Sequence, residues 1–145
     1  MQLVERGNVD QVGTFNGNPL TMAAARAALT EVLTKDAYAR FDALDAILRD
    51  GSQRVIDEYR LPANVETLGA KGSVTYSATP VREYRDGLAI DERPSYLAWL
   101  WQLNRGVFKS PWAKWESWTT SVVHSDEDAM RYVDNFAELA EAIAS

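Results

Sequence analysis

A hydroxyl and a run of flexible backbone amides stand directly ahead of a helix start near the N-terminus. The segment reads GTFNGNP and begins at Gly13. Asn18 is a favoured helix N-cap, and Pro19 fits the first helical position, where a missing N–H costs nothing. Gly13 and Gly17 permit backbone conformations closed to other residues, so Thr14 can offer its hydroxyl and its N–H to one phosphate oxygen. The pattern predicts either a phosphate-binding turn or a plain helix-entry turn, since Gly-Thr and Asn-Pro turns are common.

The longer string GTFNGNPLTMAAARAALTEVL resembles the class III (fold type I) pyridoxal-phosphate aminotransferases, and most closely the glutamate-1-semialdehyde 2,1-aminomutases. In that family a Gly-Thr-aromatic-x-Gly-Asn-Pro segment opens a long alanine-rich helix. The likeness continues from Gly69 to Ser77, from Leu103 to Phe108 with Ser110-Pro111 after it, and from Thr119 to Asp128. It therefore covers nearly all of the chain. The resemblance implies an enzyme that uses pyridoxal phosphate to move an amino group on a small amino-acid or amino-aldehyde substrate.

The resemblance also implies roles for single residues. Gly13 and Thr14 match the family motif that binds the phosphate of the cofactor held by the neighbouring subunit of a homodimer. The family's Schiff-base lysine lies a few dozen residues before that motif, whereas the lysines here, at positions 35, 71, 109 and 114, all follow it. We therefore expect the chain to be the C-terminal part of such an enzyme, without a catalytic residue, cofactor binding or activity of its own. The alternative is a stand-alone structural or ligand-binding domain derived from the same fold.

Three tryptophans recur at three-residue spacing in one segment. Trp112, Trp115 and Trp118 could stack on bases or sugars, yet large aromatic side chains mostly supply buried area in a core or a cleft wall. The resemblance places residues 110–117 in a loop at the mouth of the active site, so Trp112, Trp115 and Glu116 are candidates to line the substrate entrance. A carboxylate among tryptophans would be desolvated, which would raise its pKa; a solvated loop charge is the alternative for Glu116.

The remaining polar clusters favour structural roles. His124 is the sole histidine, and without a cysteine partner it makes a poor metal site, so we expect no metal and a turn histidine at this position. The acids of residues 126–128 suit the positive end of a helix dipole. No arginine lies between Trp115 and Val123, where many transaminases hold a substrate carboxylate; by resemblance this favours the aminomutase-like branch, or amines and β-amino acids as substrates.

Composition excludes several classes of protein. A formal charge of -6 and a sequence pI near 4.8 oppose a nucleic-acid surface, which needs clustered lysine and arginine. The chain has no cysteine, which excludes a disulfide framework and favours a cytoplasmic location. We find neither an apolar run that could span a membrane nor a signal peptide.

Hydrophobic periodicity predicts the elements that position these residues. Helices are expected from Pro19 to Leu33, from Asp36 to a stop at Pro62, over residues 96–103 with a cap at Gly106, and from residues 125–128 onward. The second and last helices should bury Phe41, Leu44, Leu48, Val55, Tyr59, and Ala129, Val133, Phe136, Ala140, Ile143.

The alternation between residues 65 and 78 predicts a strand, with Gly69 and Gly72 marking a hairpin or bulge before it. Two short strands are expected at 107–109 and 118–123, and the charged stretch 79–94 is expected to be irregular. The result is an α+β two-layer fold, a small antiparallel or mixed sheet packed by helices. We expect a single domain over 1–145, with 1–17 as the edge of a larger domain and 18–145 as a small domain like that of fold type I enzymes.

Overall fold

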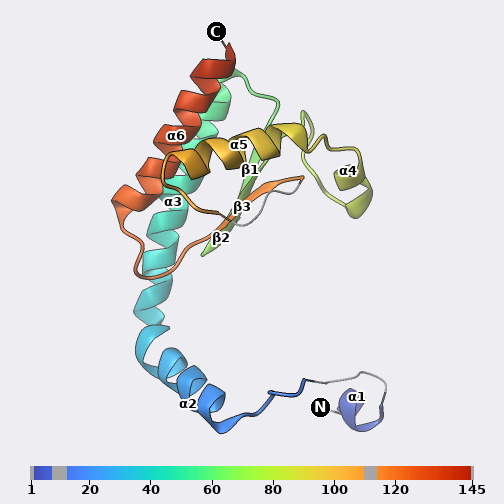
Figure 1. The fold of residues 1–145 in the computed structure, drawn as a ribbon, viewed down its shortest axis with the longest axis vertical. Helices are drawn as coiled ribbons and strands as arrows, with labels where there is room; N and C mark the ends of the chain where they lie inside the picture. The colour runs from blue at the N-terminus through green and yellow to red at the C-terminus, as the bar shows by residue number, and fades with distance from the viewer. Residues whose placement is uncertain (1, 8–12, 110–113, 145) are drawn as a thin grey trace. The chain divides into compact units, whose positions relative to one another are not determined.

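A computed structural model describes residues 2–7, 13–109 and 114–144, which form two compact units (Figure 1). The first unit is Met1–Thr34 and contains α1 (Gln2–Glu5), α2 (Pro19–Ala27) and a π-helical turn, η1 (Ala28–Val32). The second unit is Lys35–Ser145. Its elements are, in order, α3 (Lys35–Tyr59), β1 (Asn64–Leu68), β2 (Lys71–Thr75), α4 (Tyr84–Leu88), α5 (Arg93–Asn104), β3 (Glu116–Thr119) and α6 (Asp126–Ala144).

The helix predicted after Pro19 is confirmed, and its last turn is wider than an α-helical one. The side-chain oxygen of Asn18 accepts hydrogen bonds from the N–H groups of Leu20 and Thr21, at 2.8 and 3.3 Å, so Asn18 is the N-cap. In the π-helical turn, the Thr30 hydroxyl donates to the carbonyl of Arg26 at 2.8 Å. That bond competes with the backbone ladder, which accounts for the local widening.

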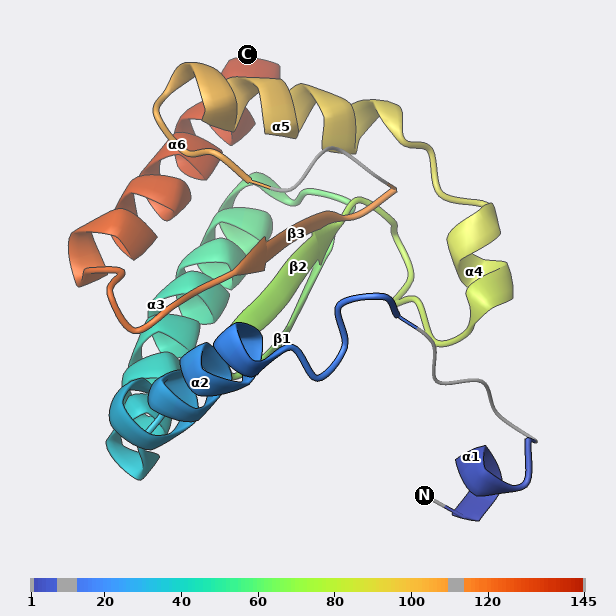
Figure 2. The same cartoon turned by 60° about the horizontal axis from the view of Figure 1, so that its bottom comes forward.

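The sheet of the second unit is antiparallel with the order β1-β2-β3 (Figure 2). Strands β1 and β2 form a hairpin that turns at Gly69, whose φ of +56° is in the left-handed region that favours glycine. The single strand predicted over 65–78 is therefore wrong, because the turn at Gly69 divides it. Gly72 is not the turn residue: it lies within β2 opposite Trp118, and a Cβ there would stand 2.6 Å from the Cε2 atom of the indole ring.

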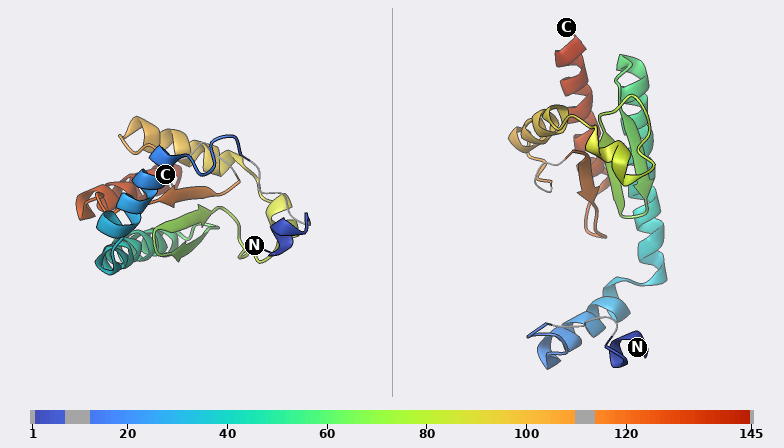
Figure 3. Two further views of the ribbon diagram at one scale, coloured as in Figure 1. Left: turned by 90° about the horizontal axis from the view of Figure 1, so that it is seen from below. Right: turned by 90° about the vertical axis from the view of Figure 1, so that its right-hand side faces the viewer.

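Two long helices, α3 and α6, pack side by side and form the main apolar layer of this unit (Figures 1 and 3). α3 also contacts β1 and β2, and α5 contacts α6 and β3. The core combines the predicted faces of both helices with the inner face of the sheet. Its most deeply buried side chains are Leu44, Leu48, Val74, Phe136 and Ala140. The predicted α+β class, a small antiparallel sheet packed by helices, is confirmed.

A buried amide network fixes α5 on α6. Gln102 donates from Nε2 to the carbonyl of Tyr132 at 2.9 Å, and its Oε1 accepts from Nδ2 of Asn135 at 2.9 Å. Both side chains are almost fully buried, so each bond satisfies groups that would otherwise be costly to remove from water. At the start of α6, Ser125 and Asp128 form the predicted capping box: the Ser125 N–H donates to the Asp128 carboxylate at 2.8 Å, and the Asp128 N–H donates to the Ser125 hydroxyl at 3.1 Å.

The predicted ends of some elements are wrong for local reasons. Residues 107–109 form no strand, because α5 closes with Gly106 at φ +83° and the Val107 N–H donates to the carbonyl of Gln102 at 2.9 Å. The strand predicted at 118–123 is β3, which starts two residues earlier and ends at Thr119. The stretch expected to be irregular contains α4, because the Asp86 carboxylate accepts from the N–H groups of Arg82 and Glu83.

Two side chains predicted to be buried are more exposed than expected. Phe41 is only half-buried, and Ile143 is 56% exposed because the last turn of α6 extends past the core. Among the described residues, no helix combines the length and apolar character needed to cross a bilayer.

Candidate functional site

The phosphate-binding turn predicted around Thr14 is a tight double turn in the first unit. The Asn16 N–H donates to the carbonyl of Gly13 at 3.0 Å, and the Asn18 N–H donates to the carbonyl of Phe15 at 3.2 Å. Gly17 has φ +75°, a conformation that favours glycine. A Cβ at Gly13 would stand 2.6 Å from the Asn16 side chain, so glycine is also required there for steric reasons.

Thr14 is exposed in this turn and keeps its donors available. Among the described residues neither its N–H nor its hydroxyl has a hydrogen-bond partner. Asn18 already caps the first N–H groups of α2, so an anion at this turn would bind through Thr14 and not through the end of the helix. The charge is suitable, because no acidic residue occurs from Gly13 to Thr30 and Arg26 lies in the last turn of α2. The turn therefore fits a phosphate group.

The residues predicted to line the substrate entrance belong to the second unit. Trp112 lies outside the described residues. Trp115 is 43% exposed, and one edge of its ring faces α4, where a Cβ on Gly87 would stand 3.6 Å from its Cζ3 atom. Glu116 begins β3 and pairs with Val74 of β2.

A shallow groove on the outer face of the sheet runs past Trp115. Its walls include the strand residues Lys71, Ser73, Ser117 and Thr119. Ser73 and Ser117 are direct partners across β2 and β3, so their hydroxyls share one face of the sheet with Lys71. This face is polar, whereas the opposite face carries Val74 and Trp118 into the core.

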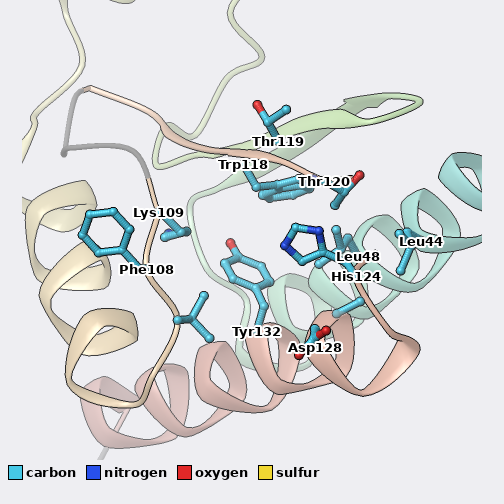
Figure 4. Close-up of a pocket in the computed structure, with 12 residues that line it drawn as sticks. Leu44, Leu48, Phe108, Lys109, Trp118, Thr119, Thr120, His124, Asp128 and Tyr132 are labelled. Atoms are coloured by element: carbon cyan, nitrogen blue, oxygen red, sulfur yellow. The ribbon is translucent and has the colours of Figure 1, made fainter. Parts of the chain in front are cut away.

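The second unit also contains a cavity that sequence reasoning missed (Figure 4). It has a volume of about 170 Å³ and lies between α3, α6, the start of β3 and the segment after α5. Its lining residues are Leu44, Leu48, Val107, Phe108, Lys109, Trp118, Thr119, Thr120, His124, Asp128, Ala129 and Tyr132.

Lys109 is the unusual residue of this cavity. Its side chain is only 7% exposed, and burial lowers the pKa of its ammonium group to about 7. The Nζ atom lies 5.1 Å from the centroid of the Tyr132 ring, a cation–π distance. A signal existed in the sequence: the expected alternation of 107–109 places Lys109 on the same side as Val107, opposite Phe108, which is 81% exposed.

His124 is a hydrogen-bonded turn residue, as the sequence predicts. Its Nδ1 atom accepts from the N–H of Ser121 at 3.0 Å, so the neutral ring carries its proton on Nε2. The carbonyl of His124 accepts from Arg40 of α3 at 2.6 Å, and Arg40 also pairs with Asp126. These bonds tie the turn before α6 to the first part of α3.

Comparison with known proteins gives one consistent group of relatives. No protein-family model matches the chain. It is 33% identical over 127 residues to glutamate-1-semialdehyde 2,1-aminomutase of Anaeromyxobacter sp. (strain K), covering 88% of this chain and 29% of that protein. The same enzyme of Limosilactobacillus reuteri is 30% identical over 130 residues, covering 90% of the chain and 30% of the relative.

Solved structures agree with these sequence matches. A glutamate-1-semialdehyde aminomutase from Pseudomonas aeruginosa PAO1 superposes with a TM-score of 0.80 and 26% identity, covering 94% of this chain and 31% of that one. A variant of a Pseudomonas aeruginosa PAO1 aminomutase in complex with PMP gives a TM-score of 0.77 at 27% identity, covering 89% of this chain and 30% of the other. A β-phenylalanine aminotransferase from Variovorax paradoxus gives 0.75 at 26% identity, with coverage of 92% and 30%.

The chain spans about 30% of the length of each of these relatives. The recognition based on the GTFNGNP segment is confirmed: the chain is a homologue of one part of the glutamate-1-semialdehyde 2,1-aminomutases and of the transaminases that share their fold.

Proposed function

We propose that the chain supplies the phosphate-binding turn and the small α+β domain of a pyridoxal-phosphate enzyme that moves an amino group on a small substrate. The observation that carries the proposal is Thr14, which presents an N–H and a hydroxyl without partners among the described residues, in a turn framed by two required glycines. The relatives, which are named as aminomutases and aminotransferases, support it. When bound, the cofactor supplies the electron sink for transfer of the amino group.

Thr14 would hold the cofactor phosphate through its N–H and hydroxyl, while Gly13 lets the backbone approach closely. A phosphate dianion strengthens such bonds, since charge-assisted hydrogen bonds exceed neutral ones in strength. No acidic side chain occurs from Gly13 to Thr30, so none in this segment opposes the phosphate. The parent enzyme would be a homodimer, in which Thr14 contacts the cofactor of the partner subunit.

The segment before β3 would form part of the substrate entrance. The exposed side of the Trp115 ring would provide an apolar wall, with Trp112 and Glu116 beside it in the sequence. A small amino acid or amino-aldehyde matches the substrates that the names of the relatives indicate, a semialdehyde and β-phenylalanine.

The lysine that holds the cofactor covalently would come from outside these 145 residues. Lys35 begins α3, Lys71 lies in β2, Lys109 is buried in the second unit, and Lys114 donates to the carbonyl of Leu88 at 2.7 Å. None precedes Gly13. The competing function is a stand-alone binding domain with the same fold.

A chimera tests the proposal. The chain replaces the homologous segment of the Pseudomonas aeruginosa aminomutase, and the affinity for pyridoxal phosphate is measured by equilibrium dialysis. Thr14→Ala should weaken binding roughly ten- to a hundredfold, because a hydrogen bond to a charged group contributes about 1.5–3 kcal/mol. Thr14→Ser, the matched control, should retain most of the affinity. Equal affinities for wild type and Thr14→Ala would refute the phosphate role and favour the plain helix-entry turn.

A further inference from the structure

We infer that the cavity beside Lys109 binds a small monocarboxylate with an apolar body. The cavity lies wholly within the second unit and contains none of the residues assigned to cofactor or substrate above. The inference is therefore independent of the proposed function.

The walls of the cavity select an apolar body. Leu44 and Leu48 come from α3, Ala129 and Tyr132 from α6, and Trp118 from β3. An apolar cavity of about 150 Å³ is enough to hold a benzene ring. The volume here, about 170 Å³, therefore accommodates one ring or a short branched chain.

The polar groups of the cavity select a negative charge. Figure 4 shows Lys109, Trp118, His124 and Tyr132 arranged around one space. Lys109 contributes an amine, and the neutral ring of His124 contributes an Nε2–H. The indole N–H of Trp118 is buried without an acceptor among the described residues, which is costly unless a ligand supplies one. A carboxylate accepts from all three kinds of donor.

The one carboxylate on the wall is already engaged. Asp128 accepts from the N–H of Ser125 at 2.8 Å and from its hydroxyl at 2.9 Å, and these bonds lower its pKa. Its charge is therefore used to cap α6. A single lysine facing apolar walls matches a monoanion better than a phosphate dianion, which would need further cationic donors.

Binding should take up a proton. The titratable groups on the cavity wall are Lys109, His124, Asp128 and Tyr132, while α3 contributes only Leu44 and Leu48. Lys109 binds the carboxylate in its charged form, and above neutral pH burial keeps this amine mostly uncharged. The affinity should therefore fall as the pH rises from about 7 to about 9, approaching a tenfold loss for each pH unit.

The probe is benzoate, compared with its neutral analogue benzamide and its cationic analogue benzylamine. Titration of the 145-residue chain is followed by calorimetry, in two buffers of different ionisation enthalpy, and by the NMR signal of the Trp118 indole N–H. Benzoate should bind at least about tenfold more tightly than either analogue and take up close to one proton at about pH 8.5. Both effects should disappear in Lys109→Met. The matched control is Lys71→Met, which removes an exposed lysine of β2.

Three outcomes would overturn the inference. Equal binding of benzoate and benzamide would leave only an apolar cavity. Tighter binding of benzylamine would make Asp128 the recognition group. Absence of saturable benzoate binding would mean that the cavity takes no such ligand. The comparison of the three ligands uses the wild-type chain, so it decides the question even if Lys109→Met fails to fold.

Discussion

Gly51 of α3 lies directly against Val133 of α6, and a Cβ at position 51 would stand 2.7 Å from the Cγ2 atom of that valine. The glycine lets the two long helices approach closely at their contact. Gly51→Ala should gain about 1 kcal/mol from helix propensity but lose about 1–3 kcal/mol to overpacking. We expect net destabilisation in urea unfolding. The double variant Gly51→Ala, Val133→Ala should recover most of the loss; a more stable single variant would show that the helices separate easily.

Leu44→Ala should be among the most destabilising changes in the second unit. The side chain is 0% exposed in the core cluster, so truncation loses transfer free energy and leaves a cavity, at a cost of about 2–5 kcal/mol. Phe41→Ala, three residues away and half-buried, should cost less and serves as the comparison. A reversed order in thermal unfolding would mean that the helix presents a different face to the core.

Lys109 should make stability depend on pH between about 7 and about 10. Its pKa is lowered from 10.5 in the unfolded chain to about 7 in the fold, so the unfolded state binds more protons in this range and stability rises with pH. Below about pH 7 the full burial penalty applies. Lys109→Met should flatten this slope and stabilise the protein at neutral pH by an amount on the order of a few kcal/mol.

The pH experiment has an upper limit set by two tyrosines. Burial raises the pKa of Tyr76 and of Tyr132, and ionisation of these side chains in the unfolded state destabilises the fold at still higher pH. Urea titrations from about pH 7 to about 9.5 avoid that region. A wild-type slope equal to that of Lys109→Met would place the ammonium in a wetter environment than the structure indicates.

The chain alone should form no specific covalent adduct with pyridoxal phosphate and should show no aminotransferase activity. The family's lysine position has no counterpart before Gly13. Borohydride reduction followed by peptide mass spectrometry should find only scattered, unsaturable labelling of lysines. Stoichiometric labelling of one lysine would contradict this, and Lys109 is the position to inspect because its pKa is lowest.

The sequence predicts those elements whose signals are local or strongly periodic. α6 carries both a capping box at Ser125 and a regular apolar face, and α3 keeps its apolar spacing over many turns, so their existence and buried faces follow from the pattern. The turn at Gly69 was also visible. By contrast, α4 depends on one carboxylate, Asp86, that accepts two backbone N–H groups, and a charged stretch does not announce such a bond.

The cavity of Lys109 could not be predicted from the sequence, because its walls come from four separate segments. Thr14 differs, since its turn is made by neighbouring residues and can be seen in the sequence. The same contrast explains the strand predicted at 107–109. The pattern gave the correct side for Lys109, but the hydrogen bond from Val107 back to Gln102 used the N–H that a strand would need.

The pairing of α3 with α6 determines when this unit can fold during synthesis. Arg40 and Asp126, which join the two helices near their beginnings, are 86 residues apart in the chain. α3 emerges from the ribosome first, with Leu44 and Leu48 facing water until α6 has been made. Such distant contacts slow folding and leave apolar surface open to aggregation. Nascent chains arrested before α6 should therefore bind chaperones, whereas chains that include it should be released.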